Sequence, residues 1–201
     1  MTGVSIGQPA PAFHLPSAQG PAVRLEQFRG TKNVIVWFTK GMGCVFCRQH
    51  MSQLAKIYPD IQKRETELLE IVPSTVDRGR HYAQKYRLPF PYLCDADDAV
   101  RRTWQLEVRS HGPLWYAKAF KLGMTAPKEL KKNDFGQDSP QVGEMLTMMR
   151  DDDSGLFVVD RAGVVRYRYA GAYVERAGGP PSIRPLPPSD EILGELDHLA
   201  T

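Results

Sequence analysis

The chain has 201 residues, of which 42% are hydrophobic and 24% charged, and its formal net charge is +3. This length and composition are typical of a globular protein with room for one well-packed core. The small net charge, with no long run of Lys or Arg, argues against a nucleic-acid partner. No segment approaches the roughly 20 apolar residues that a membrane-spanning helix needs, so we expect no membrane partner.

The N-terminus and the cysteine content bear on the cellular compartment. Residues 1–9 lack a basic region followed by an apolar run, so they do not resemble a secretory signal, and we expect a cytoplasmic protein. The 3 cysteines are too few for a disulfide framework. In a reducing compartment, closely spaced cysteines are more often catalytic, redox-active or metal-binding than permanently cross-linked.

The first half of the chain predicts alternating strands and helices. Residues 7–29 carry several prolines and predict an extended lead-in with one short hairpin. The nearly continuous apolar run over 33–39 predicts a strand that is buried on both faces. Apolar residues then recur at helical spacing over 45–65, which predicts a helix. Four further elements are expected: a buried strand at 67–73, a helix at 77–87, a short edge strand at 90–94 and a short helix at 97–104.

The second half of the chain predicts a β-hairpin and a final helix. Two strands, at 155–160 and 164–169, flank a turn in which Gly163 can take a positive φ. The Gly- and Pro-rich residues 178–188 predict an irregular link to a C-terminal helix at about 189–199.

The order of these elements predicts the fold class. Strands that alternate with helices pair in parallel through right-handed crossovers, and the late hairpin adds antiparallel strands. We therefore expect an α/β fold with a central mixed sheet flanked by helices, in a single domain over residues 1–201. Residues 107–150 have a helical pattern of their own and predict an insertion, which forms either a wall of the substrate site or a contact in a homodimer.

Cys44 and Cys47 stand where the first predicted core strand gives way to the first predicted helix. Cysteines at this spacing share one face of a helix and can form a disulfide. The unpaired N–H groups and the dipole of a helix N-terminus stabilise a thiolate, which favours Cys44 as the attacking thiol. Lys40 and Arg48 are close enough in sequence to add positive charge, and Thr39 can hydrogen-bond near the thiolate.

The loop before the pair also suits redox chemistry, because Gly41 and Gly43 leave it free to expose the sulfur of Cys44. In this interpretation, Cys47 resolves the reaction by forming an intramolecular disulfide. The alternatives are a thiolate site that binds zinc or copper(I), and two inert buried cysteines. No second closely spaced Cys/His pair supplies the remaining zinc ligands, so we prefer a redox pair that needs no metal or other cofactor.

Two other features have less certain chemistry. Cys94 is expected to be a small buried residue, with a resolving role as the alternative. The adjacent carboxylates of Asp151, Asp152 and Asp153 cannot all face one ion, so we expect a solvated turn there.

Four parts of the sequence occur in the order and spacing of a known protein family: residues 7–13 with 25–30, then 34–47, 90–97 and 155–167. Together they resemble the peroxiredoxin-like group of the AhpC/TSA (alkyl hydroperoxide reductase/thiol-specific antioxidant) family, within the thioredoxin-like superfamily. The resemblance implies a thioredoxin-like fold and an antioxidant, thiol-dependent oxidoreductase. It also implies a peroxide or disulfide substrate, and a thiol reductant of the thioredoxin or glutathione type.

The chain departs from the family pattern at the cysteine pair. In the family motif Pro-x-x-x-Thr/Ser-x-x-Cys, the last residue is the peroxidatic cysteine, and it aligns with Cys47. Lys40 then takes the place of the Pro, and Cys44 that of the Thr or Ser. The place of the family's later Arg falls near Ser154. The motif therefore favours Cys47 as the attacking thiol, whereas the helix terminus favours Cys44, which we prefer.

Overall fold

The computed structural model describes residues 4–109, 112–114, 117–118, 121, 133–135, 151–172, 174–175 and 182–199. Most of the expected insertion at 107–150 lies outside these residues, so its packing and any dimer contact stay predictions. None of the helices in the described part of the chain is long and apolar enough to cross a membrane.

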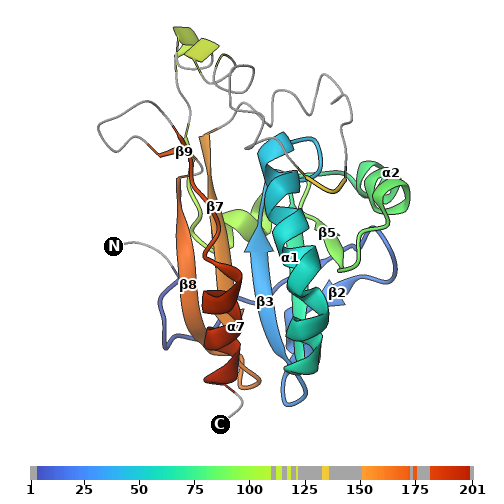
Figure 1. Ribbon diagram of the computed structural model, residues 1–201, viewed down its shortest axis with the longest axis vertical. Helices are drawn as coiled ribbons and strands as arrows, with labels where there is room; N and C mark the ends of the chain where they lie inside the picture. The colour runs from blue at the N-terminus through green and yellow to red at the C-terminus, as the bar shows by residue number, and fades with distance from the viewer. Residues whose placement is uncertain are drawn as a thin grey trace.

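The parallel half of the central sheet is built on β3 (Asn33–Phe38), which is buried along its whole length (Figure 1). β3 pairs in parallel with β4 (Thr66–Val72), and β4 pairs in parallel with β5 (Tyr92–Cys94). β5 forms the edge of the sheet. These three strands and the edge position of the third are as the sequence predicts.

The antiparallel half begins with β7 (Asp151–Val159), which lies beside β3 on the side away from β4. β8 (Val165–Ala172) pairs with β7 through the predicted hairpin, and Gly163 takes a φ of +83° in the turn. The short strand β6 (Val108–Arg109) pairs with the start of β7. The prediction of one mixed sheet is confirmed.

Three helices cover one face of the sheet. They are α1 (Val45–Lys63), α2 (Val76–Tyr86) and α7 (Ser189–Asp197), which lies beside α1 in Figure 1. Ile35 and Trp37 of β3 point to this face and pack with apolar residues of all three helices. The amphipathic spacing that predicts α1 and α7 therefore serves to cover the sheet.

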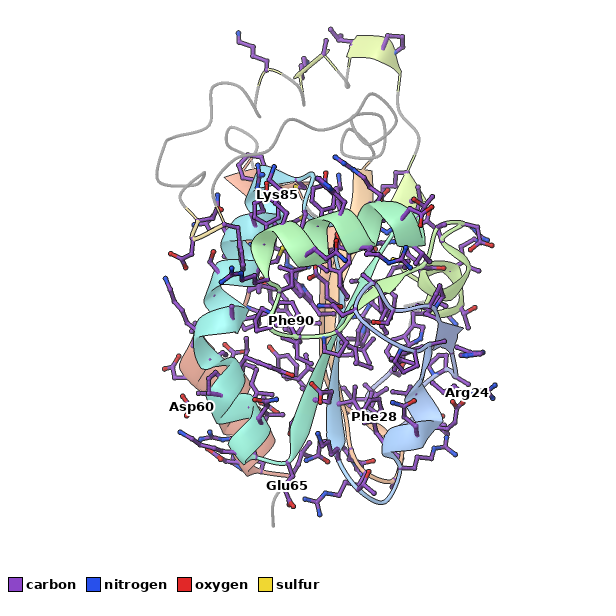
Figure 2. All side chains as sticks on the ribbon, turned by 90° about the vertical axis from the view of Figure 1, so that its right-hand side faces the viewer. Arg24, Phe28, Asp60, Glu65, Lys85 and Phe90 are labelled. Atoms are coloured by element: carbon purple, nitrogen blue, oxygen red, sulfur yellow. The ribbon has the colours of Figure 1, made fainter. Side chains whose placement is uncertain are left out.

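The opposite face is covered mainly by the N-terminal lead-in. Its expected hairpin is present as β1 (His14–Leu15) and β2 (Val23–Arg24), followed by the short 3-10 helix η1 (Leu25–Phe28). Figure 2 shows Arg24 and Phe28 on one side of the sheet and Asp60 of α1 on the other. The short helix α3 (Ala99–Thr103) lies next to this second core, which contains Trp104.

Two expectations for the C-terminal part of the chain are wrong. Residues 151–153 do not form a solvated turn but begin β7, and Asp152 and Asp153 are only 1% and 9% exposed. β6 pairs with this end of β7, and Arg109 donates a hydrogen bond to the Asp153 carboxylate at 2.7 Å, which offsets the burial of its charge. The expected irregular link at 178–188 contains β10 (Ser182–Ile183), which pairs with β9 (Val174–Glu175).

Candidate active site

The cysteine pair lies where β3 ends and α1 begins, as the sequence predicts (Figure 1). Cys44 is the N-cap residue of α1, with an extended backbone, and Cys47 lies in the first helical turn. Both cysteines are free thiols, and they are close enough to hydrogen-bond. Cys44 is 7% exposed and Cys47 is 0% exposed, so a substrate from solvent reaches Cys44 first.

The expectation that the glycines expose the sulfur of Cys44 is not met in this reduced structure. Gly41 has a φ of +80°, and a Cβ built on it would lie 2.5 Å from Tyr92 Oη. Gly41 is therefore required for the close packing of the loop against β5 as well as for its backbone conformation. The loop holds Cys44 against the core rather than presenting it to solvent.

Electrostatics nevertheless favour the thiolate of Cys44. Its pKa falls from 9.0 to about 6, chiefly because the Cys47 thiol donates a hydrogen bond to it. The charge of Lys40 and the N–H groups of Cys47 and Phe46 lower the pKa further, against the opposing effect of burial. Neither N–H group forms a close capping hydrogen bond with the Cys44 side chain, so the Cys47 thiol is the main stabilising group.

This cause of the lowered pKa predicts a difference between two Cys47 variants. Cys47→Ala removes the donor, and we expect the pH midpoint for alkylation of Cys44 by iodoacetamide to rise by about one unit or more. Cys47→Ser keeps a hydroxyl donor and should leave the midpoint near the native value of about 6. Mass spectrometry of the Cys44 peptide after timed alkylation measures both midpoints. Equal midpoints in the Ala and Ser variants would contradict the assigned cause.

Thr39 supports the loop from below rather than contacting the thiols. Its hydroxyl donates to Glu70 Oε1 at 2.8 Å and accepts from the N–H of Gly41 at 2.9 Å. Tyr92 Oη accepts from the N–H of Met42 at 3.0 Å, which fixes the next residue of the loop. Side chains of β4 and β5 therefore position the backbone that leads into Cys44.

Glu70 is a site residue that sequence reasoning missed. It lies on β4, is 0% exposed, and has no hydrogen-bond partner at Oε2 among the described residues. Burial raises the pKa of Glu70 from 4.5 to about 8, although the hydrogen bond from Thr39 partly opposes this. The signal was a carboxylate inside an apolar strand that is covered on both faces.

Arg101 of α3 was also missed. It is 1% exposed and donates to the carbonyl oxygens of Thr39 and Asp153, at 2.7 and 2.6 Å. It also pairs with Asp98 at 3.3 Å. Arg101 thus joins the end of β3 to the start of β7, next to Ser154, where the family pattern places its Arg.

Lys40 and Arg48 occupy different surroundings. Lys40 is partly buried and close enough to lower the pKa of Cys44. Arg48 follows Cys47 on α1 and is 3% exposed, yet its charge is not among the causes that lower the Cys44 pKa. Its Nε and Nη1 atoms are buried without a hydrogen-bond partner in the described part of the chain. The structure therefore brings Cys44, Cys47 and Lys40 together and leaves the role of Arg48 open to a ligand.

Cys94 lies at the end of β5 and is 3% exposed, as expected for a buried residue. Burial raises its pKa to about 11, so its thiol stays protonated at neutral pH. A Cβ on Gly79 would lie 2.7 Å from its sulfur, which shows how closely α2 packs against it. Within the described ranges, no group of three or more His, Cys, Asp or Glu residues is placed to hold a metal ion.

Comparisons with known proteins point to one family. The AhpC/TSA family profile matches residues 6–168 of the chain. Peroxiredoxin Q, chloroplastic, of Populus jackii is 26% identical over 147 residues, which cover 73% of this chain and 68% of the relative. Peroxiredoxin Q of Xanthomonas campestris has a similar solved structure, with a TM-score of 0.59 at 17% identity, covering 94% of this chain and 92% of that one.

A second solved structure, the reduced 2-Cys peroxiredoxin of Plasmodium vivax, has a TM-score of 0.61 at 16% identity. The match covers 96% of this chain and 94% of that chain. At such low identities these structures bear on the fold alone, and they confirm the predicted thioredoxin-like architecture.

Proposed function

Because the chain belongs to the AhpC/TSA family, we propose that its Cys44–Cys47 pair reduces a peroxide, with Cys44 as the attacking thiol. The protein is a thiol-dependent oxidoreductase of the peroxiredoxin-like kind. The metal-binding alternative gains no support from the relatives, which include peroxiredoxins Q.

The proposed cycle uses both thiols. The Cys44 thiolate attacks the terminal oxygen of a hydroperoxide, an S–O bond forms, and the O–O bond breaks. The leaving oxygen takes a proton and departs as an alcohol, or as water from hydrogen peroxide, while Cys44 becomes a sulfenic acid. The Cys47 sulfur then attacks the Cys44 sulfur and displaces water, which leaves an intramolecular disulfide. Two electrons pass from the cysteine pair to the peroxide.

The lowered pKa of Cys44 is the observation that carries this assignment. A pKa of about 6 makes Cys44 mostly thiolate at neutral pH, and the thiolate is the nucleophilic form. Cys47 is fully buried and serves as the hydrogen-bond donor to Cys44, a position from which it can later attack the sulfenic acid. The geometry therefore favours Cys44 over the alignment-based choice of Cys47.

One equivalent of hydrogen peroxide tests the cycle. We expect the reduced protein to lose two hydrogens, mapped by mass spectrometry to the peptide that contains Cys44 and Cys47. In stopped-flow measurements, the reaction should be much faster than that of free cysteine at the same pH. Two thiols that stay open to alkylation, or a rate no faster than that of free cysteine, would overturn the proposal.

A thiol reductant must return the disulfide to the dithiol. We propose a dithiol protein of the thioredoxin type or glutathione, acting through a mixed disulfide with Cys44, because Cys44 is the more exposed of the two residues. A cytoplasmic location and a homodimer stay predictions from the sequence.

A further inference from the structure

Arg48 carries a charge that the described structure leaves uncompensated. The residue is 3% exposed, and its Nε and Nη1 atoms have no hydrogen-bond partner in the ranges described. A buried cation without partners is costly, because it has lost its hydration and gained nothing in return. Unpaired buried donors of this kind commonly mark a site for a ligand.

The place of Arg48 on α1 puts this charge beside the reactive thiol. Its N–H donates to the carbonyl of Cys44 at 3.1 Å, so the two residues lie on the same side of the first turn. Helical side chains lean toward the N-terminus, which directs the Arg48 side chain back toward Cys44. The separation of the two residues along the helix axis is about 6 Å.

The face of α1 that carries Arg48 shows why its own chain does not neutralise it. Ser52, one turn further along, accepts a hydrogen bond from the N–H of Asp134 at 2.9 Å. The carboxylate of Asp134 pairs with Lys56 at 3.1 Å, two turns away from Arg48. The first turn of α1 contains no acidic residue. The N-terminal end of this face is therefore a cationic position with no anion from the described residues.

Charge balance indicates what kind of anion fits. The Cys44 thiolate is matched by Lys40, which lowers its pKa, so Arg48 has one positive charge to offer. A carboxylate supplies one negative charge, and the small exposed fractions of Arg48 and Cys44 favour a compact group. The helix N-terminus adds a field that favours the same sign of charge.

We propose that Arg48 and the first turn of α1 form a subsite for a carboxylate, so that the preferred substrates are organic hydroperoxides carrying a carboxylate near the peroxide group. The hydroperoxide then meets Cys44 while the carboxylate binds Arg48. The subsite itself stands on the geometry around Arg48, whereas the substrate class rests on the proposed peroxide reduction.

Two alkylating reagents test the subsite without peroxide chemistry. Iodoacetate carries a carboxylate and iodoacetamide is its neutral analogue, and both react with Cys44. We expect Arg48→Gln to lower the ratio of the iodoacetate rate to the iodoacetamide rate about tenfold, as for loss of a charged hydrogen bond. Arg48→Lys keeps the charge and should retain part of the ratio. Lys56→Gln removes an exposed cation further along the same helix and should leave the ratio unchanged.

The ratio is independent of the amount of active protein, and the Lys variant guards against poor folding of the Gln variant. An unchanged ratio in folded Arg48→Gln, or an equal fall in Lys56→Gln, would overturn the subsite. The second arm compares a carboxylated tertiary alkyl hydroperoxide with its methyl ester. Native protein should reduce the acid about tenfold faster than the ester, and Arg48→Gln should reduce both at similar rates. Equal rates in the native protein would overturn the substrate class. If no hydroperoxide reacts while the alkylation ratio still falls, peroxide reduction fails and the subsite stands.

Discussion

Replacing Cys44 by serine is expected to lower the rate of peroxide reduction about a thousandfold or more, because it removes the only thiolate that the structure stabilises at the pair. Cys47→Ser should behave differently. The serine hydroxyl can still donate to Cys44, so the first reaction with peroxide should keep a rate within several-fold of the native value. The cycle should then stop at the sulfenic acid, because no second thiol is present to displace water.

Stopped-flow kinetics of a single turnover separate the two variants, and dimedone labelling identifies the sulfenic acid in Cys47→Ser by its mass on the Cys44 peptide. Cys94→Ser is the matched control, since Cys94 is buried at the end of β5 with a raised pKa and should not affect the rate. The opposite pattern, with attack lost in Cys47→Ser and kept in Cys44→Ser, would assign the attacking role to Cys47, as the family motif implies.

Glu70 should make the protein less stable as the pH rises. Its pKa in the folded state is about 8, against an ordinary value of 4.5, so between these values the folded state binds more protons than the unfolded state. Stability is therefore lost as the pH rises through this window, by up to about 1.4 kcal/mol per pH unit. Glu70→Gln cannot ionise, and we expect its unfolding free energy to lack this fall.

Chemical denaturation between about pH 5 and 8 measures the slope, in the Cys44→Ser background so that ionisation of Cys44 does not contribute. Cys44 would otherwise add an opposite trend, because its lowered pKa stabilises the folded state as the pH rises above about 6. Thr39→Val offers a matched comparison, since loss of the hydrogen bond to Glu70 raises the pKa of Glu70 and should shift its window to higher pH. Parallel slopes for the native residue and Gln at position 70 would contradict the buried, protonated carboxyl.

The sequence predicts the layout of this protein well because its local signals agree with its tertiary contacts. The apolar run of β3 and the helical spacing of α1 place Cys44 and Cys47 at a strand–helix junction, and the structure has them there. Gly163 predicts the turn of the β7–β8 hairpin because that turn requires a positive φ, which is a local property.

The supports of the site could not be predicted, because they depend on contacts between distant parts of the chain. Glu70 hydrogen-bonds Thr39 across two neighbouring strands, and Arg101 reaches the carbonyls of Thr39 and Asp153 from a separate helix. Asp153 failed as a predicted turn residue for the same reason, since its hydrogen bond from Arg109 and the pairing of β6 are not visible in local composition.

The hydrogen bond between the two thiols also affects the reduction potential of the pair. It stabilises the Cys44 thiolate, which exists only in the reduced state, and is lost when the disulfide forms. At pH 7, a fall in one pKa from 9.0 to about 6 favours the reduced form by about 1.4 kcal/mol, or about 30 mV for two electrons. The disulfide is to that extent a better oxidant than one from two ordinary thiols. The contact that prepares Cys44 for attack therefore also eases the return of the pair to its starting state by a thiol donor.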